Sequence, residues 1–235
     1  DVVFHYCHAS EGAEAAAAEA KQSGVRAEAM GADFNDVDAV RDLAAQAEEM
    51  LGGIDVLVNN AGITTNLPFH DVTVEQFDTL YNVNIRAMYF LTQAVTRGMA
   101  DRGRGVVINL TSVHANHALT EHSIYAGTKG AIVSFTRTLS VEMALKGIRV
   151  NAISAGPVRT LAGAGIGDAR AMLGWQQRNS PLRRTITIDD VGGSALYLLS
   201  DLSSGVTGEI HFVDAGYNST SMPAIEQLKK QPEAQ

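Results

Sequence analysis

The sequence has little of what several classes of protein depend on. It contains one cysteine, Cys7, in 235 residues, so no disulfide can form within the chain and no cluster of thiolates can hold a metal. Its 18 Lys and Arg residues are outnumbered by 26 Asp and Glu residues, which leaves a net charge of -8 and no basic surface for a phosphate backbone. No apolar run approaches the roughly 18 residues of a membrane span, and no charged leader with an apolar core opens the chain. We therefore expect no nucleic-acid partner, no membrane partner and a cytoplasmic location.

Short apolar runs rich in β-branched residues alternate with longer stretches of helical periodicity. Three consecutive apolar residues close each of the segments 55–58 and 105–108, which is typical of strands buried on both faces of a parallel sheet. The fold predicted is α/β, a doubly wound parallel sheet (Rossmann-like) within a single domain. The strands are expected at 1–6, 25–30, 54–58, 106–110, 148–153 and 209–213, and the helices at 13–22, 37–51, 74–99, 123–145, 168–177 and 188–199.

The domain is expected to span residues 1–220, followed by a polar C-terminal tail at 221–235. In an open α/β sheet the ligand lies across the carboxyl ends of the strands. Four polar or glycine-containing segments follow expected strands, at 31–33, 59–62, 110–112 and 154–157. These segments are the first candidates for a binding site.

Tyr125 and Lys129 stand four residues apart near the start of an expected helix, so both side chains lie on one helical face. A tyrosine is a weak acid at neutral pH, but an ammonium group beside it favours the phenolate and lowers the pKa of the phenol. The pair could then exchange a proton with a substrate oxygen. A chance pair on a surface helix has the same spacing, so the motif alone is weak.

Two further polar residues strengthen this hypothesis. Ser112 follows an apolar strand and stands thirteen residues before Tyr125, where its hydroxyl could bind the same substrate oxygen. Asn84 falls within an otherwise apolar helix, where an amide can open the helix locally or hold a water that links Lys129 to solvent. An asparagine that simply faces solvent is the alternative.

In this order and at these separations, Asn59-Asn-Ala-Gly62, Asn84, Ser112, Tyr125 and Lys129 resemble the short-chain dehydrogenase/reductase family over nearly the whole chain, from residue 1 to about 217. The resemblance implies that Tyr125 is the general acid-base and that Lys129 lowers its pKa. Ser112 would orient the carbonyl or hydroxyl group, and Asn84 would anchor a relay water. The cofactor-binding residues implied are Asp33, Phe34, Asn60, Ala61, Gly62, Tyr125, Lys129, Pro157, Val158 and Thr160.

The chain departs from the family's pattern at its start. The family's glycine-rich turn, which cradles the cofactor pyrophosphate after the first strand, is not in the sequence, and residues 1–6 resemble the second strand. We expect either a fragment that lacks its start or a natural truncation with impaired cofactor binding. The glycine-rich segment 163–167 does not follow a strand and is expected to be part of a substrate loop.

The C-terminal third departs in another way. Segments 151–162, 180–185 and 189–192 resemble enoyl-acyl carrier protein reductases, a divergent branch of the family. Those enzymes place the active tyrosine seven residues before the lysine, where this chain has His122. The chain thus combines ketoreductase-type catalytic spacing with an enoyl-reductase-like lid, and we give the catalytic spacing more weight.

The sequence carries fewer signals for the choice of cofactor and substrate than for the catalytic residues. An acid at the end of the second strand would bind the ribose of NAD and repel a 2′-phosphate, but that end has His5, Tyr6, Cys7 and His8. We therefore favour NADP, with NAD possible. Three histidines, His114, His117 and His122, lack acidic or cysteine partners at ligand spacing, so we expect them to line the substrate mouth and predict no metal site.

The favoured hypothesis is an NAD(P)-dependent oxidoreductase that interconverts a ketone and a secondary alcohol, such as a 3-oxoacyl thioester, a sugar or a small ketone. An enoyl-acyl carrier protein reductase is the first alternative. A catalytically silent scaffold without the cofactor loop is the second. In the resembling family the equivalents of helices 74–99 and 123–145 pair between subunits, so a homo-oligomer, either a tetramer or a dimer, is expected.

Overall fold

Every strand pairing in the described chain is parallel, as the apolar strand sequences predict. The computed structural model describes residues 1–158 and 169–220. Strands β1 and β2 form one sheet, and the other has the order β3-β4-β5-β6. The strand bounds are β1 (Val2–Tyr6), β2 (Ala27–Gly31), β3 (Val56–Asn59), β4 (Gly105–Ser112), β5 (Ile148–Ala155) and β6 (Ile210–Val213).

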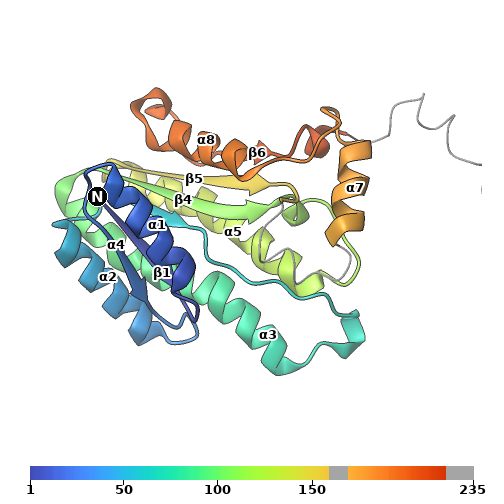
Figure 1. Ribbon diagram of the computed structural model, residues 1–235, viewed down its shortest axis with the longest axis horizontal. Helices are drawn as coiled ribbons and strands as arrows, with labels where there is room; N and C mark the ends of the chain where they lie inside the picture. The colour runs from blue at the N-terminus through green and yellow to red at the C-terminus, as the bar shows by residue number, and fades with distance from the viewer. Residues whose placement is uncertain (159–168, 221–235) are drawn as a thin grey trace, which may run out of the picture.

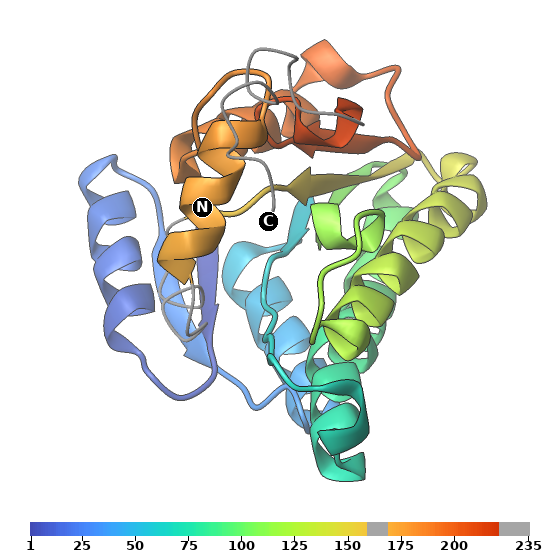
Figure 2. The same cartoon turned by 90° about the vertical axis from the view of Figure 1, so that its right-hand side faces the viewer.

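Among the described residues, each sheet ends in strands that pair on one side only, and β1 and β3 are two of these edge strands. Strand β1 pairs only with β2, and β3 pairs only with β4 (Figure 2). Val56 and Val58 of β3 are accordingly 39% and 42% exposed, although their sequence is that of a buried strand. The doubly wound sheet is therefore present in two parts, and the expected first strand with its glycine-rich turn is not among them.

Helices cover the sheets on two sides (Figure 1). Helices α2, α4 and α5 share one apolar cluster with the sheet, while α8 packs over β4, β5 and β6 on the other side and α1 packs on β1 and β2. No helix in the part of the chain that the structure describes is long and apolar enough to cross a membrane. The helix bounds are α1 (Glu11–Gln22), α2 (Val37–Leu51), α3 (Val74–Tyr81), α4 (Met88–Arg102), α5 (Ser123–Ala144), α7 (Ala169–Asn179) and α8 (Ile188–Leu199).

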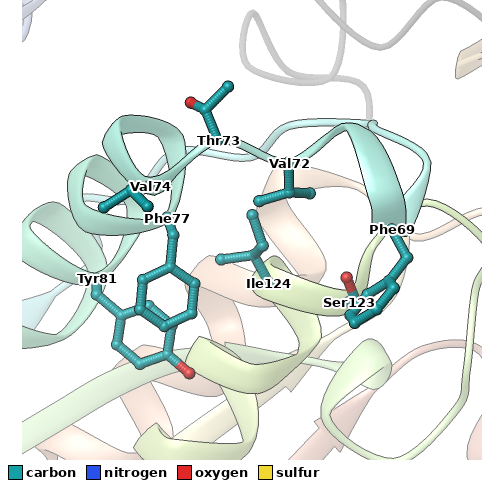
Figure 3. Close-up of a pocket in the computed structure, with 8 residues that line it drawn as sticks. All are labelled: Phe69, Val72, Thr73, Val74, Phe77, Tyr81, Ser123 and Ile124. Atoms are coloured by element: carbon teal, nitrogen blue, oxygen red, sulfur yellow. The ribbon is translucent and has the colours of Figure 1, made fainter.

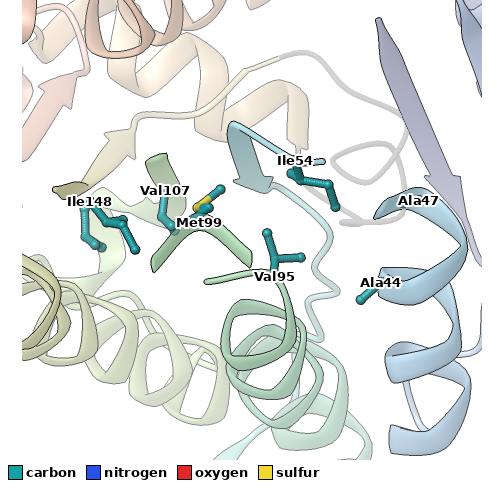
Figure 4. Close-up of a cluster of buried hydrophobic side chains, with 8 residues drawn as sticks. Ala44, Ala47, Ile54, Val95, Met99, Val107 and Ile148 are labelled. Carbon is teal, nitrogen blue, oxygen red and sulfur yellow. The ribbon is translucent and has the colours of Figure 1, made fainter. Parts of the chain in front are cut away.

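The two faces of β4 and β5 belong to different hydrophobic clusters. Val107 and Val150 pack with Met99 of α4 in the cluster of Figure 4. Ile108 and Ile153, one or three residues further along, pack with Leu198 of α8. Because side chains alternate between the faces of a strand, these consecutive apolar residues fill both layers.

One predicted helix is interrupted. The segment 74–99 forms α3, then a π-helical turn at Asn82–Ala87, then α4. Thr73 begins α3 with a capping box in which its side chain and that of Gln76 each bind the other's backbone N–H. The π-helical turn contains Asn84, which agrees with the expectation that this amide opens the helix locally.

Leu198 and Leu196 of α8 provide a matched test of this packing. Leu198 is fully buried between α8 and the sheet, whereas Leu196 is 69% exposed. We expect Leu198→Ala to lower the free energy of unfolding by about 2–5 kcal/mol, because it leaves a cavity in the core. Leu196→Ala should change it by less than about 0.5 kcal/mol. Urea denaturation measures both, and equal losses would contradict the placement of Leu198.

Candidate active site

The candidate catalytic side chains meet at the carboxyl edge of the sheet. Ser112 is the last residue of β4, and Tyr125 and Lys129 lie in the first two turns of α5, which packs on β4 and β5. In Figure 1 the arrowheads of β4 and β5 point toward this end of the molecule, where α7 also lies. The strand ends therefore bring together residues that are far apart in the sequence.

Lys129 is a buried cation. Its side chain is 5% exposed, and Nζ donates a hydrogen bond to the backbone oxygen of Leu110 at 2.8 Å. Burial lowers the pKa of its ammonium group from 10.5 to about 8. Nζ lies 5.6 Å from the centroid of the Tyr125 ring, so the spacing of four does place the two side chains together.

The pKa of Tyr125 differs from our expectation. Burial raises the pKa of the phenol, and a hydrogen bond from Ser112, which favours the phenolate, only partly opposes this. We expected Lys129 to lower this pKa. In the structure Nζ faces the ring and is engaged by Leu110, so Ser112 is the group that stabilises the phenolate.

Asn84 joins three segments through its buried amide. Its Oδ1 accepts from the N–H of Ile63 at 2.8 Å, and its Nδ2 donates to the oxygen of Ile63 at 2.9 Å and to Thr128 Oγ1 at 3.1 Å. These bonds hold the segment after β3 against the π-helical turn and α5. The structure thus gives Asn84 a positioning role that the sequence alone did not indicate.

Two threonines that sequence reasoning missed complete this arrangement. Thr111 Oγ1 donates to the oxygen of Lys129 at 2.8 Å, which ties β4 to the turn of α5 that carries the lysine. Thr128 is fully buried and donates to the oxygen of Tyr125 at 2.8 Å. Their signal in the sequence is that each is a polar residue directly beside a candidate catalytic residue.

The segment after β3 runs directly against the lysine. A Cβ atom at Gly62 would lie 3.3 Å from Asn84 Oδ1 and 3.6 Å from Lys129 Nζ, so only a glycine leaves this space open. Asn60 and Ala61 are exposed beside it. Lys129 has three N–H donors and one hydrogen-bond acceptor among the described residues. These free donors in an open backbone cradle fit a hydroxyl-bearing cofactor.

Two buried polar atoms without a hydrogen-bond partner at the same edge also fit a hydroxyl-bearing cofactor. Ser154 Oγ near the end of β5 and Thr64 Oγ1 after β3 are buried without a hydrogen-bond partner. A nicotinamide dinucleotide carries hydroxyl and amide groups that could satisfy atoms of this kind. The residues present therefore fit the cofactor that the sequence implies.

The remaining predicted cofactor residues have different surroundings. Asp33 is exposed, and its carboxylate accepts from the backbone N–H of Asn35 at 2.9 Å, which lowers the pKa of the carboxyl group. The Phe34 ring is buried and stacks on His5 with centroids 4.0 Å apart, so only its backbone is left for a cofactor. Pro157 and Val158 are half-buried just after β5, whereas Thr160 and segment 163–167 lie outside the described residues.

Helix α7 packs directly on the segment that follows β5. A Cβ atom at Gly156 would lie 2.6 Å from Nε2 of the buried Gln176, so a larger residue there would displace the side-chain amide of Gln176. Gln176 also donates to the oxygen of Asp214 at 3.4 Å, beyond the end of β6. Trp175, its neighbour in α7, is half exposed.

An apolar pocket lies on the other side of the first turn of α5 (Figure 3). It has a volume of about 380 Å³. Ser123 and Ile124, directly before Tyr125, form one wall, and α3 with the segment before it forms the other. The lining residues are Phe69, Val72, Thr73, Val74, Phe77, Tyr81, Ser123 and Ile124.

The chain is similar in sequence to known proteins. A family model described as "Enoyl-(Acyl carrier protein) reductase" matches residues 1–218. The chain is 45% identical over 201 residues to enoyl-acyl-carrier-protein reductase (NADH) 2 of Rhizobium meliloti (strain 1021), covering 84% of this chain and 73% of the relative. It is 40% identical over 181 residues to L-xylulose reductase of Bos taurus, covering 74% and 72%.

A solved structure shows the same fold. Gluconate 5-dehydrogenase from Burkholderia cenocepacia J2315, in complex with NADP and tartrate, superposes with a TM-score of 0.85 at 31% identity. The match covers 93% of this chain and 85% of that chain. All of these proteins are oxidoreductases by name, which agrees with the candidate catalytic residues gathered at the carboxyl edge.

The buried ammonium of Lys129 predicts a pH dependence of stability. Between about pH 8 and 10.5 the unfolded lysine holds its proton while the folded one has lost it, so the free energy of unfolding rises with pH in this window. Relative to a Lys129→Met variant, the protein should gain about 2–3 kcal/mol between pH 7 and pH 10. Urea denaturation at both pH values measures this gain.

The exposed Lys146 supplies the control for this measurement. Lys146→Met should show the same pH dependence as the unchanged protein, because that ammonium group is in water in both states. A parallel pH course for the Lys129→Met variant and the unchanged protein would contradict the burial of a charged Lys129.

Proposed function

The chain belongs to the short-chain dehydrogenase/reductase family of oxidoreductases, and from that premise we propose that it interconverts ketones and secondary alcohols with a nicotinamide cofactor. The observation that carries this proposal is the contact of Ser112, Tyr125 and Lys129 at one end of β4 and α5. Residues 1–220 would form the catalytic domain. The substrate would be a small carbonyl compound or the matching alcohol.

Tyr125 is the proposed proton donor. Its raised pKa keeps the phenol protonated at neutral pH, so it can give a proton to a carbonyl oxygen that gains negative charge. A bound nicotinamide supplies or accepts the hydride. The Ser112 hydroxyl hydrogen-bonds the phenol and favours the phenolate that remains, so it lowers the cost of the proton transfer.

Lys129 and Asn84 have supporting roles in this proposal. The two free N–H donors of Lys129 would bind the hydroxyl groups of the cofactor ribose. Asn84 would anchor a relay water through the second lone pair of Oδ1, since its other hydrogen-bonding capacity is used by Ile63 and Thr128.

The cofactor would lie across the segments at the strand ends. Asp33 and the backbone of Phe34 would be close to its adenine, and Asn60, Ala61 and Gly62 would lie along its length. Pro157, Val158 and Thr160 would close over the nicotinamide. The open space at Gly62 and the unpaired Ser154 hydroxyl support this course.

An enoyl thioester reductase is the second candidate, favoured by the description of the matching family model and by the relative from Rhizobium meliloti. The position of its expected tyrosine is occupied by His122. That imidazole is 3% exposed, and its Nδ1 lies 2.9 Å from the oxygen of Thr120. An imidazole has no phenol group, so His122 cannot act as the tyrosine of that mechanism. We therefore prefer the carbonyl substrate.

We also propose a homo-oligomer, a tetramer or a dimer, in the cytoplasm. Tyr89 on α4 and Val141 on α5 are exposed large hydrophobic residues, and Leu145 at the end of α5 is fully exposed. Burial of such side chains against a second copy would be favourable. The free and exposed thiol of Cys7 is compatible with a reducing compartment.

Replacement of Tyr125 tests the proposed mechanism. Tyr125→Phe should reduce kcat by about 10²-fold or more, because the positioned general acid is lost. Its affinity for the cofactor should stay nearly unchanged in a fluorescence titration. Tyr197→Phe, on α8 and away from the site, is the matched control and should keep full activity. Full activity of Tyr125→Phe would refute the assignment, and turnover of enoyl thioesters alone would favour the second candidate.

Cofactor choice is the finer part of the proposal. The end of β1 has no acid, so we propose that NADP is used and that NAD also binds. The Asp33 carboxylate lies 3.9 Å from Cys7 Sγ, so it places a negative charge near this end and should limit the preference for a 2′-phosphate. The relatives are named for NADH in one case and bound to NADP in another.

Asp33→Asn tests this charge effect. We expect the variant to bind NADPH about fivefold more tightly relative to NADH, from roughly 1 kcal/mol of relieved repulsion. Asp38→Asn, in the first turn of α2, is the control and should leave the ratio of the two dissociation constants unchanged. No change of the ratio in Asp33→Asn would show that this carboxylate does not face the ribose.

A further inference from the structure

Three histidines lie between Ser112 and Tyr125 in the sequence; we call them the histidine wall (His114, His117, His122). The backbone N–H of His114 donates to Ser112 Oγ at 3.2 Å. The ring centroid of His114 lies 5.7 Å from that of His122, which in turn lies 6.2 Å from the centroid of Tyr125. A substrate held against Tyr125 is therefore next to the imidazole of His122 and close to that of His114.

Backbone carbonyls fix the tautomer of two of these rings. Nδ1 of His114 lies 3.2 Å from the oxygen of His117, and Nδ1 of His122 lies 2.9 Å from the oxygen of Thr120. A carbonyl oxygen can only accept, so each Nδ1 carries the hydrogen and the Nε2 atom of a neutral ring has a free lone pair. Burial lowers the pKa of His114, so this ring is neutral at neutral pH.

The Nε2 atoms of His114 and His122 have no hydrogen-bond partner among the described residues. Neither atom is one of the buried side-chain atoms that lack a partner, so neither is an unsatisfied acceptor in the free protein. A ligand that supplies hydroxyl groups can donate to both of them. An apolar acyl chain in the same place would leave both acceptors without water and without a donor.

Aromatic rings continue the wall on its far side. The His117 ring lies 5.2 Å from Tyr217, and its Nε2 lies 3.0 Å from Asn218 Oδ1. Tyr217 in turn makes an edge contact at 5.6 Å with Trp175 of α7, which is 49% exposed. Apolar ring surface beside a few fixed polar atoms is the composition of a site for a small ligand.

We propose that the substrate is a small ketone that carries hydroxyl groups next to its carbonyl, or the corresponding polyol, and that His114 and His122 accept hydrogen bonds from those hydroxyls. This inference rests on the proposed carbonyl chemistry and specifies its substrate class. The apolar pocket of Figure 3 does not compete for this role, because none of the three histidines lines it.

The test compares two ketones with the same carbon skeleton, erythrulose with three hydroxyl groups and 2-butanone with none. Reduction is followed by the loss of NADPH or NADH absorbance with the full chain. We expect kcat/KM for erythrulose to exceed that for 2-butanone by about 10²-fold or more, because a site built for hydroxyl groups rejects an analogue without them.

Variants of His114 test whether the histidine wall causes the difference in kcat/KM between erythrulose and 2-butanone. His114→Phe should reduce the ratio at least tenfold, whereas His114→Gln, whose side-chain oxygen also accepts, should retain most of it. His70→Phe is the matched control, because His70 is exposed in the segment before α3, and it should leave the ratio unchanged.

The outcomes distinguish a failure of the carbonyl chemistry from a failure of the role given to the histidine wall. If neither ketone nor a broader ketone panel is reduced, the carbonyl chemistry itself is refuted. If both ketones are reduced with a ratio near one, or if His114→Phe leaves a high ratio intact, the carbonyl chemistry stands and the assignment of the histidine wall is overturned.

Discussion

The arrangement of the site depends on the burial of one ammonium group. Lys129 has no carboxylate within the described residues to pair with, and its contact is the carbonyl oxygen of Leu110. A buried charge is tolerated only where polar atoms are fixed around it. The turn of α5 that carries Lys129 is therefore tied to β4 through Thr111, and the neighbouring turn is tied to Asn84 through Thr128. These same ties place Tyr125 beside Ser112, so the cost of burying the charge and the geometry of the proposed proton donor cannot be separated.

The hydrogen bonds of Asn84 also fix the position of the segment after β3. Its amide makes three hydrogen bonds with backbone and side-chain atoms, and it does so from a π-helical turn. A regular helix from 74 to 99 would satisfy the periodicity of the apolar residues equally well. The wider turn is retained because the amide finds better partners across the site than along the helix, which is typical of π-helical turns at functional positions. The helix loses its regular α-helical hydrogen bonding at this turn, and Asn84 in return holds Gly62 against Lys129.

Much of the fold could be predicted from the sequence, because consecutive apolar residues mark doubly covered strands and three-to-four spacing marks helices. Helices α2 and α8 begin and end where the pattern predicts. The gathering of Ser112, Tyr125 and Lys129 followed from their order and from the geometry of parallel strands. The local opening of the helix at Asn84 was also expected, but the partners of its amide, the roles of Thr111 and Thr128 and the direction of the pKa of Tyr125 could not be predicted. They depend on which atoms meet in three dimensions and on how much water is excluded, and no spacing in the sequence encodes these quantities.

In the proposed function, chemistry and specificity belong to different parts of this site. The candidate reacting groups lie on β4 and α5, whose positions are fixed by the core and by the buried polar contacts. The groups that face the rest of a substrate lie on the segment between them and on residues after β6, joined by ring contacts and by the bond between His117 and Asn218. A change in that segment can alter which ketone is accepted without moving Tyr125. Relatives named for enoyl thioesters, for xylulose and for gluconate can therefore share one scaffold, and the identity of the substrate has to be argued from residues 113–122 rather than from the fold.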